Sequence, residues 1–144
     1  MNIIDFSASN NFKSFNNTPI GSVKKLITFL ANDNNRKKRI YIEFNIKAPT
    51  YRMFCFHIVG YSYSSNKSFN VVISGYINNN KIQRSNSTDN NFIVFLNKNN
   101  RLVVKIKLKP YYTFFNISAI IGDNNSKNID VKRIVVEKPG VYGA

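Results

Sequence analysis

Residues 101–109, with the sequence RLVVKIKLK, alternate apolar and basic side chains more regularly than any other stretch of the chain. Successive side chains of an extended strand point to opposite faces, so this stretch would have one aliphatic and one basic face. Its predicted inward residues are Leu102, Val104, Ile106 and Leu108, and its predicted outward residues are Lys105, Lys107 and Lys109. The stretch therefore predicts a β-strand that lies between a hydrophobic core and solvent.

Other patterned segments extend this strand pattern along the chain. Lys38–Ile46 (KRIYIEFNI) also has a period of two, which predicts a half-buried strand. Arg52–Tyr61 (RMFCFHIVGY) is apolar on both faces, which predicts a central strand that is covered on both sides. Further strands are predicted at Phe69–Ile77, Asn91–Leu96, Tyr111–Ile121 and Ile129–Glu137, separated by asparagine-rich turns and by prolines.

The segment Ser22–Ala31 fits both helical spacing and strand alternation. We favour a strand, because Gly21 and several β-branched residues weaken the helical alternative. Roughly seven to nine short strands without a convincing helix predict an all-β fold, namely a single-domain antiparallel β-sandwich or jelly roll. The chain of 144 residues has the size of one domain, with residues 1–21 as an N-terminal arm or edge strand and 22–144 as the sandwich.

The residues that usually carry chemistry are few and scattered. Cys55 and His57 are the only residues of their types, and both lie in an apolar strand where we expect them to be core residues. The seven carboxylates form no close pair and are expected in turns or in solvent. Phosphate-binding and nucleophile motifs are absent, so we predict no enzymatic activity, no metal and no cofactor. No signal peptide or membrane-spanning segment is predicted.

The formal net charge of +14 predicts attraction to anionic partners. A basic run comprises Arg36, Lys37, Lys38 and Arg39, and the lysine row Lys105, Lys107 and Lys109 would extend this surface if both lie on one face. Such a surface could bind nucleic acid or an acidic protein. Equally, the run could be a charged turn and the row a solvated face that prevents aggregation.

Aromatic residues supply a second candidate surface. The tyrosines singled out as able to stack on sugar rings or bases are Tyr61, Tyr63, Tyr111 and Tyr112. The alternative is that they only fill strand positions, for which tyrosine is well suited.

Residues 52–121 resemble the receptor-side terminal domains of bacteriophage tail and head fibres, particularly those of AT-rich phages of Bacteroides-type hosts. The resemblance lies in strands that close with Gly60-Tyr61-x-Tyr63 and Gly75-Tyr76, and in Tyr112 before Phe114. It implies a β-sandwich, homo-oligomerisation, often as a trimer, and a place on a virion. In such domains the matching glycines and tyrosines are expected to set strand ends.

These observations lead to one leading functional expectation and two alternatives. The leading one is a phage virion structural protein, made in the host cytoplasm, that decorates the capsid or forms part of a fibre and attaches multivalently to other virion proteins. The first alternative is a fibre tip that reads a host-surface glycan through exposed tyrosines. The second is a basic nucleic-acid-binding domain that uses the arginine and lysine residues above.

Overall fold

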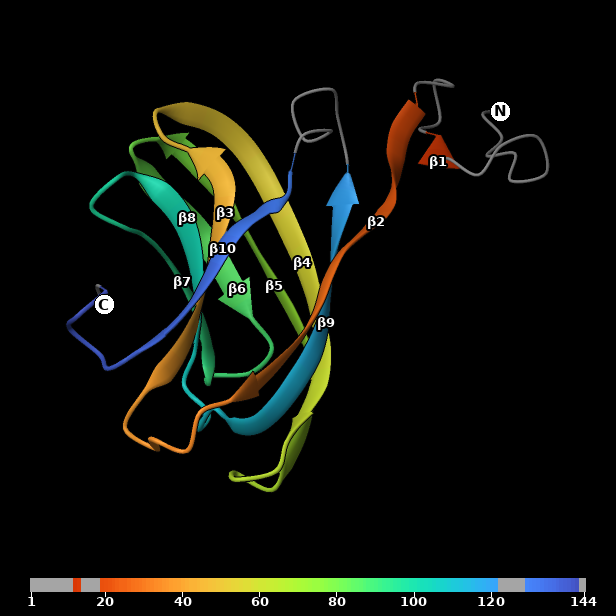
Figure 1. Cartoon of the computed structure of the whole chain (residues 1–144). Helices are drawn as coiled ribbons and strands as arrows, with labels where there is room; N and C mark the ends of the chain where they lie inside the picture. The colour runs from red at the N-terminus through yellow and green to blue at the C-terminus, as the bar shows by residue number, and fades with distance from the viewer. Residues whose placement is uncertain (1–11, 14–18, 122–128, 143–144) are drawn as a thin grey trace.

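The computed structural model describes residues 12–13, 19–121 and 129–142. The described residues form ten β-strands: β1 (Phe12–Lys13), β2 (Pro19–Asn32), β3 (Arg39–Lys47), β4 (Thr50–Ser62), β5 (Lys67–Asn79), β6 (Lys81–Ser87), β7 (Phe92–Leu96), β8 (Arg101–Ile106), β9 (Tyr111–Ile121) and β10 (Val131–Glu137). They build a six-stranded sheet in the order β1-β2-β9-β4-β5-β6 and a four-stranded sheet in the order β10-β3-β8-β7. The two antiparallel sheets pack against each other (Figure 1), which confirms the predicted β-sandwich.

Strands that are far apart in the sequence lie side by side in both sheets. β2 pairs with β9, with Leu30 opposite Phe114, and β3 pairs with β8, with Ile42 opposite Val104. β4, β5 and β6 instead form a meander of consecutive neighbours. The predicted strand at Ser22–Ala31 is confirmed as part of β2. Most of the predicted arm, residues 1–11 and 14–18, lies outside the described residues.

The hydrophobic core lies between the two layers. The inward residues of β8 that the alternation predicted are buried, and β8 itself ends at Ile106, before the last lysines of the pattern. Phe44 on β3 stacks on Phe56 on β4 across the layers, with ring centroids 4.1 Å apart and an angle of 11° between the rings. This parallel contact joins the centres of the two sheets.

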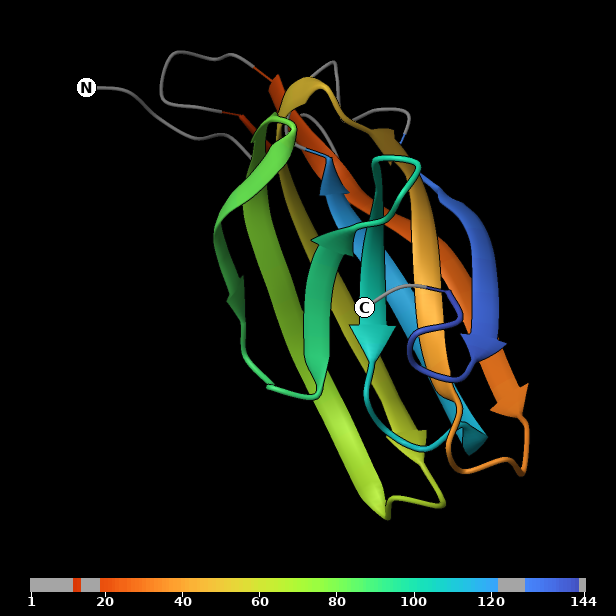
Figure 2. The same ribbon diagram turned by 90° about the vertical axis from the view of Figure 1, so that its left-hand side faces the viewer.

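The outer face of the four-stranded sheet is covered, which corrects the prediction of a half-buried strand at Lys38–Ile46. Tyr41 and Glu43, on the outer face of β3, are both buried. The segment that follows β10 lies over this face (Figure 2), and the ring centroid of Tyr142 lies 5.0 Å from that of Tyr41. The Tyr142 hydroxyl donates a hydrogen bond to the Glu43 carboxylate. The expectation that every carboxylate lies in a turn or in solvent is therefore wrong for Glu43.

The outer face of the six-stranded sheet is uncovered in the described structure. This corrects the prediction that Arg52–Tyr61 is a central strand covered on both sides. β4 is central in this sheet, but Met53 is 72% exposed and Val59 is also exposed. His57 is exposed as well, and its Nε2 lies 2.5 Å from Asn70 Oδ1 on β5, so it is no core residue. Cys55 on the same face is half-buried. Both faces of β4 are apolar, yet only one of them packs in the core.

Two glycines allow close packing within the six-stranded sheet. β4 ends at Ser62, within the Gly60-Tyr61-x-Tyr63 motif, as the resemblance implied, whereas β5 continues beyond Gly75 to Asn79. Gly60 lies inside β4, where an added Cβ would come within 2.0 Å of the Phe114 carbonyl oxygen on β9. Gly75 lies inside β5, where a Cβ would come within 2.7 Å of the Phe54 ring. Glycine is required at Gly60 because no side chain fits between the two strand backbones.

Candidate functional site

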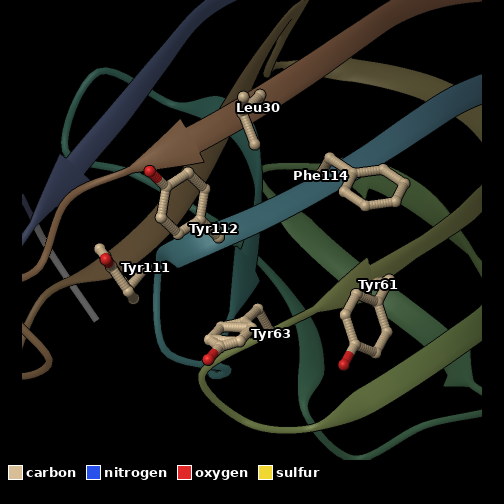
Figure 3. Close-up of a pocket in the computed structure, with 6 residues that line it drawn as sticks. All are labelled: Leu30, Tyr61, Tyr63, Tyr111, Tyr112 and Phe114. Atoms are coloured by element: carbon tan, nitrogen blue, oxygen red, sulfur yellow. The ribbon is translucent and has the colours of Figure 1, made fainter.

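An open pocket of about 360 Å³ lies on the uncovered face of the six-stranded sheet, at the end where β4 stops and β9 begins. Figure 3 shows the side chains that line it, which come from three strands and one turn: Leu30, Tyr61, Tyr63, Tyr111, Tyr112 and Phe114. We call this group the tyrosine pocket. It brings together all four tyrosines that the sequence singled out, although they belong to two segments almost fifty residues apart.

A β-bulge explains how two consecutive tyrosines line the same pocket. In the pairing of β2 with β9, Ala31 lies opposite Thr113 and Asn32 opposite Tyr111, so Tyr112 is the extra residue on β9. Its φ is 47°, in the left-handed region that bulky residues rarely adopt. A bulge of this kind redirects a side chain that regular alternation would send to the other face. Alternation from Phe114 would put Tyr112 on the pocket face and Tyr111 on the core face, so the residue that the bulge brings to the pocket is Tyr111.

The tyrosine rings support one another at steep angles. Tyr111 and Tyr112 have ring centroids 4.6 Å apart at 63°, and Tyr63 and Tyr112 lie 6.3 Å apart at 89°. Tyr61 and Phe114 form a second pair, 6.3 Å apart at 55°. Edge-to-face contacts of this type are favourable. The rings therefore form the walls of one cup and do not lie in a row of parallel platforms.

A buried polar network holds the backbone beneath the pocket. The hydroxyls of Ser62 and Thr113, both fully buried, lie 2.9 Å apart, and they lie 3.2 and 2.6 Å from the Lys109 carbonyl oxygen. In addition, the Tyr63 amide donates to the Tyr112 carbonyl at 3.0 Å. These contacts connect the β4–β5 turn, the β8–β9 loop and the start of β9. The pocket is thus preorganised by groups that do not line it.

Most phenol hydroxyls of the tyrosine pocket are available to a ligand. The Tyr61 hydroxyl donates to Asn66 Oδ1 at 3.3 Å. Within the described residues, no hydrogen bond involves the hydroxyls of Tyr63, Tyr111 or Tyr112. Each can both donate and accept. The pocket therefore combines apolar ring surface with polar groups at its rim.

The predicted basic residues lie at the same end of the sandwich. Arg36–Lys38 form the second half of the β2–β3 loop, which follows the β2 end that pairs with Tyr111. Lys107 and Lys109 belong to the β8–β9 loop, which leads into Tyr111. Both loops and the β4–β5 turn lie together at the lower end of the molecule in Figure 2. The topology thus brings the basic run, the end of the lysine row and the tyrosines to one region.

The individual basic side chains differ in what they contact. Lys38 Nζ lies 3.1 Å from Asp33 Oδ2, and the Arg39 guanidinium donates to the backbone carbonyls of Arg36 and Lys38. Lys105 Nζ lies 5.7 Å from the centroid of the Tyr41 ring, so this lysine packs on the four-stranded sheet. Burial lowers the pKa of Lys105, and the like charges of Lys107 and Arg39 add to the effect.

The side chains of Arg36, Lys37 and Lys107 are exposed, and that of Lys109 is half-buried. The predicted lysine row is therefore only partly a solvated face.

A second pocket, of about 230 Å³, lies on the same sheet face around Cys55 and His57. Burial raises the pKa of the Cys55 thiol, which favours its unreactive form. Among the described residues, no three His, Cys, Asp or Glu side chains gather as metal ligands would. The residues that the structure describes include no helix long and apolar enough to cross a membrane.

The sequence analysis did not name Leu30 or Phe114 as site residues, although both complete the tyrosine pocket. The signal for Phe114 was its place two residues after Tyr112 on a strand. Leu30 lies opposite Phe114 on the neighbouring β2, a register that no local pattern predicts.

No protein-family model, no curated protein and no solved structure matches the chain. The resemblance to phage fibre domains therefore gains no support from these comparisons and stays a prediction. Fold and pocket together define the class only as a β-sandwich with an open aromatic pocket on one face.

Proposed function

We propose that this protein is a non-enzymatic carbohydrate-binding domain that holds a sugar ring in the tyrosine pocket. The observation that supports the proposal is the convergence of four tyrosines on one preorganised pocket whose phenol hydroxyls are largely unengaged. A sugar ring has apolar C–H faces and a rim of hydroxyls. It matches a cup that has aromatic walls and hydrogen-bonding groups at its edge.

The ring geometry favours a sugar over the bases of a nucleic acid. Proteins that bind single strands place aromatic rings so that successive bases can stack on them along a charged groove. In the tyrosine pocket the rings of Tyr63, Tyr111 and Tyr112 meet one another at 63° to 89°, in a single cup. One compact ring fits this cup better than a row of flat bases does. Binding of single-stranded nucleic acid in place of a glycan would contradict this proposal.

Attachment to a virion remains the sequence-based expectation for where the domain acts. Multiple copies on a particle would raise the avidity of a shallow site without any new contact. Co-sedimentation with phage particles tests this setting separately from sugar binding. A protein that stays in the supernatant would reject the virion role and leave the carbohydrate proposal untouched.

The direct test is a glycan array probed with the protein in multivalent form, followed by calorimetry with the best ligand. Tyr112→Ala and Tyr63→Ala should each lower affinity roughly five- to thirtyfold, as expected when a central aromatic contact is truncated. Tyr51→Ala is the matched control, because Tyr51 is exposed on β4 at the end away from the pocket, whereas Tyr63 follows the other end of β4. Equal affinity for all three variants, or an array without any bound glycan, would overturn the proposal.

A further inference from the structure

The loops around the tyrosine pocket carry an unbalanced positive charge. Arg36 and Lys37 lie in the β2–β3 loop, and Lys107 and Lys109 lie in the β8–β9 loop. No carboxylate of the described residues forms an ion pair with any of these four side chains. Among the described residues, the end of the sandwich that holds the pocket therefore carries more positive than negative side chains.

Two carboxylates at this end of the sandwich, Asp33 and Asp89, already have partners, and a third, Glu137, lies opposite Arg39 in the pairing of β10 with β3. Asp33 pairs with Lys38 at 3.1 Å, at the start of the β2–β3 loop. Asp89 pairs with Lys67 at 3.0 Å, just after the β4–β5 turn. Hydrogen bonds from backbone amides, that of Asn35 to Asp33 and that of Asn91 to Asp89, hold the two carboxylates in place as well. They are committed to their own turns and do not compensate the four exposed or half-exposed cations.

We infer that the tyrosine pocket selects an acidic glycan, one whose sugar carries a carboxylate or a sulfate, and this inference rests on the carbohydrate-binding function proposed above. The tyrosine rings hold the sugar, and the surrounding loops attract its anionic group. An arginine guanidinium in particular matches a carboxylate or sulfate with two parallel N–H donors. The same field repels a cationic sugar and gives a neutral one no advantage.

Exposed ion pairs are individually weak, so the charge contributes through several cations acting together. Charges in solvent are screened over about 10 Å at 0.1 M salt. Acidic glycans should therefore lose affinity as salt rises, and neutral glycans of the same shape should not. Salt does not weaken the contacts of the tyrosine rings with either kind of glycan. The salt dependence therefore distinguishes the contribution of the basic loops from that of the rings.

The test uses an array of matched pairs, namely sialylated glycans beside their desialylated forms, and uronate oligosaccharides beside their carboxyl-reduced forms, with sulfated oligosaccharides as a third arm. The acidic member of a pair should bind at least tenfold more tightly at low salt. The triple variant R36Q/K37Q/K107Q should reduce that preference at least fivefold. The control K81Q/K98Q removes two exposed lysines at the opposite end of the sandwich and should leave the preference unchanged.

The outcomes separate this inference from the function on which it rests. Equal binding of both members of each pair, with loss in Tyr112→Ala, would overturn the acidic preference and leave the carbohydrate function standing. Acidic binding that survives Tyr112→Ala would overturn both, because charge alone would then hold the ligand. Binding of single-stranded DNA in place of every glycan would overturn both as well. A preference for the sulfated arm over the carboxylated one would support the inference and identify the anionic group.

Discussion

Replacing Arg133 with glutamine should destabilise the fold more than replacing Glu43, although the two residues form one ion pair. Arg133 Nε lies 3.0 Å from Glu43 Oε2, and this oxygen accepts no hydrogen bond from the described residues. The other oxygen, Oε1, accepts from Asn97 Nδ2 at 2.8 Å and from the Tyr142 hydroxyl. The Glu43 side chain is 2% exposed, whereas that of Arg133 is 53% exposed.

This difference in exposure determines the expected magnitudes. Arg133→Gln leaves a buried carboxylate without its counter-ion, which costs about 3 kcal/mol of unfolding free energy. Glu43→Gln leaves a guanidinium that water can solvate, and it weakens two charge-assisted hydrogen bonds, at a cost of about 1–2 kcal/mol. The double variant contains no buried charge. It should therefore be more stable than Arg133→Gln alone, so the two effects are not additive.

Urea unfolding followed by circular dichroism measures these differences. With a slope of about 2 kcal/mol per molar urea, a loss of 3 kcal/mol lowers the midpoint by about 1.5 M. Lys132→Gln, at the exposed neighbouring position, is the control and should stay within about 0.5 kcal/mol of the parent. The reasoning fails if Arg133→Gln behaves like this control, or if the double variant loses the full sum of both single costs.

Three further predictions concern backbone fit and pH. Gly60→Ala should cost about 3 kcal/mol in urea unfolding, because its Cβ would meet the β9 backbone, whereas Gly140→Ala, with open space around it and a φ of 90°, should cost about 1 kcal/mol. Burial and the hydrogen bond to Glu43 raise the pKa of Tyr142 to about 12, so folding favours the neutral phenol. In thermal melts the protein should lose this stabilisation as the pH rises from 10 to 12, and the Tyr142→Phe variant should lose less stability over that range. Burial opposes ionisation of Asp89, but the Asn91 amide and Lys67 prevail and lower its pKa. Its stabilisation is therefore present above about pH 4 and lost as the pH falls further, and in melts from pH 5 to 2.5 Asp89→Asn should lose less stability than the parent.

The sequence predicted those strands whose side chains alternate between core and solvent. On β8 the alternation correctly placed Leu102, Val104 and Ile106 in the core, although Val103, on the outer face opposite Glu43, is buried as well. β6, with the sequence KIQRSNS, was not predicted, since it is mostly polar and forms by hydrogen bonding to the edge of β5. The burial of Tyr41 and Glu43 was not predictable from local pattern either. The residue that covers them, Tyr142, lies about a hundred positions further along the chain.

The candidate site was predictable in its residue types but not in its assembly. Exposed tyrosines and basic runs stand out in the sequence one by one. Their meeting depends on the register of β9 between β2 and β4, with Tyr61 opposite Phe114 and Leu30 opposite the same residue. It depends also on the bulge at Tyr112, and a bulge is set by tertiary packing that the local sequence does not specify.

The pairing of β2 with β9 has a consequence for synthesis on the ribosome. Asn32 ends β2, and Tyr111 begins its partner 79 positions later (111 − 32). At about 5–20 residues per second, β2 emerges from the ribosome roughly 4–16 s before β9 emerges. Through that interval its edge toward β9 is an open template for other nascent chains. The yield of folded protein in a cell should therefore depend on holdase chaperones and on growth temperature, and not only on the stability of the folded state.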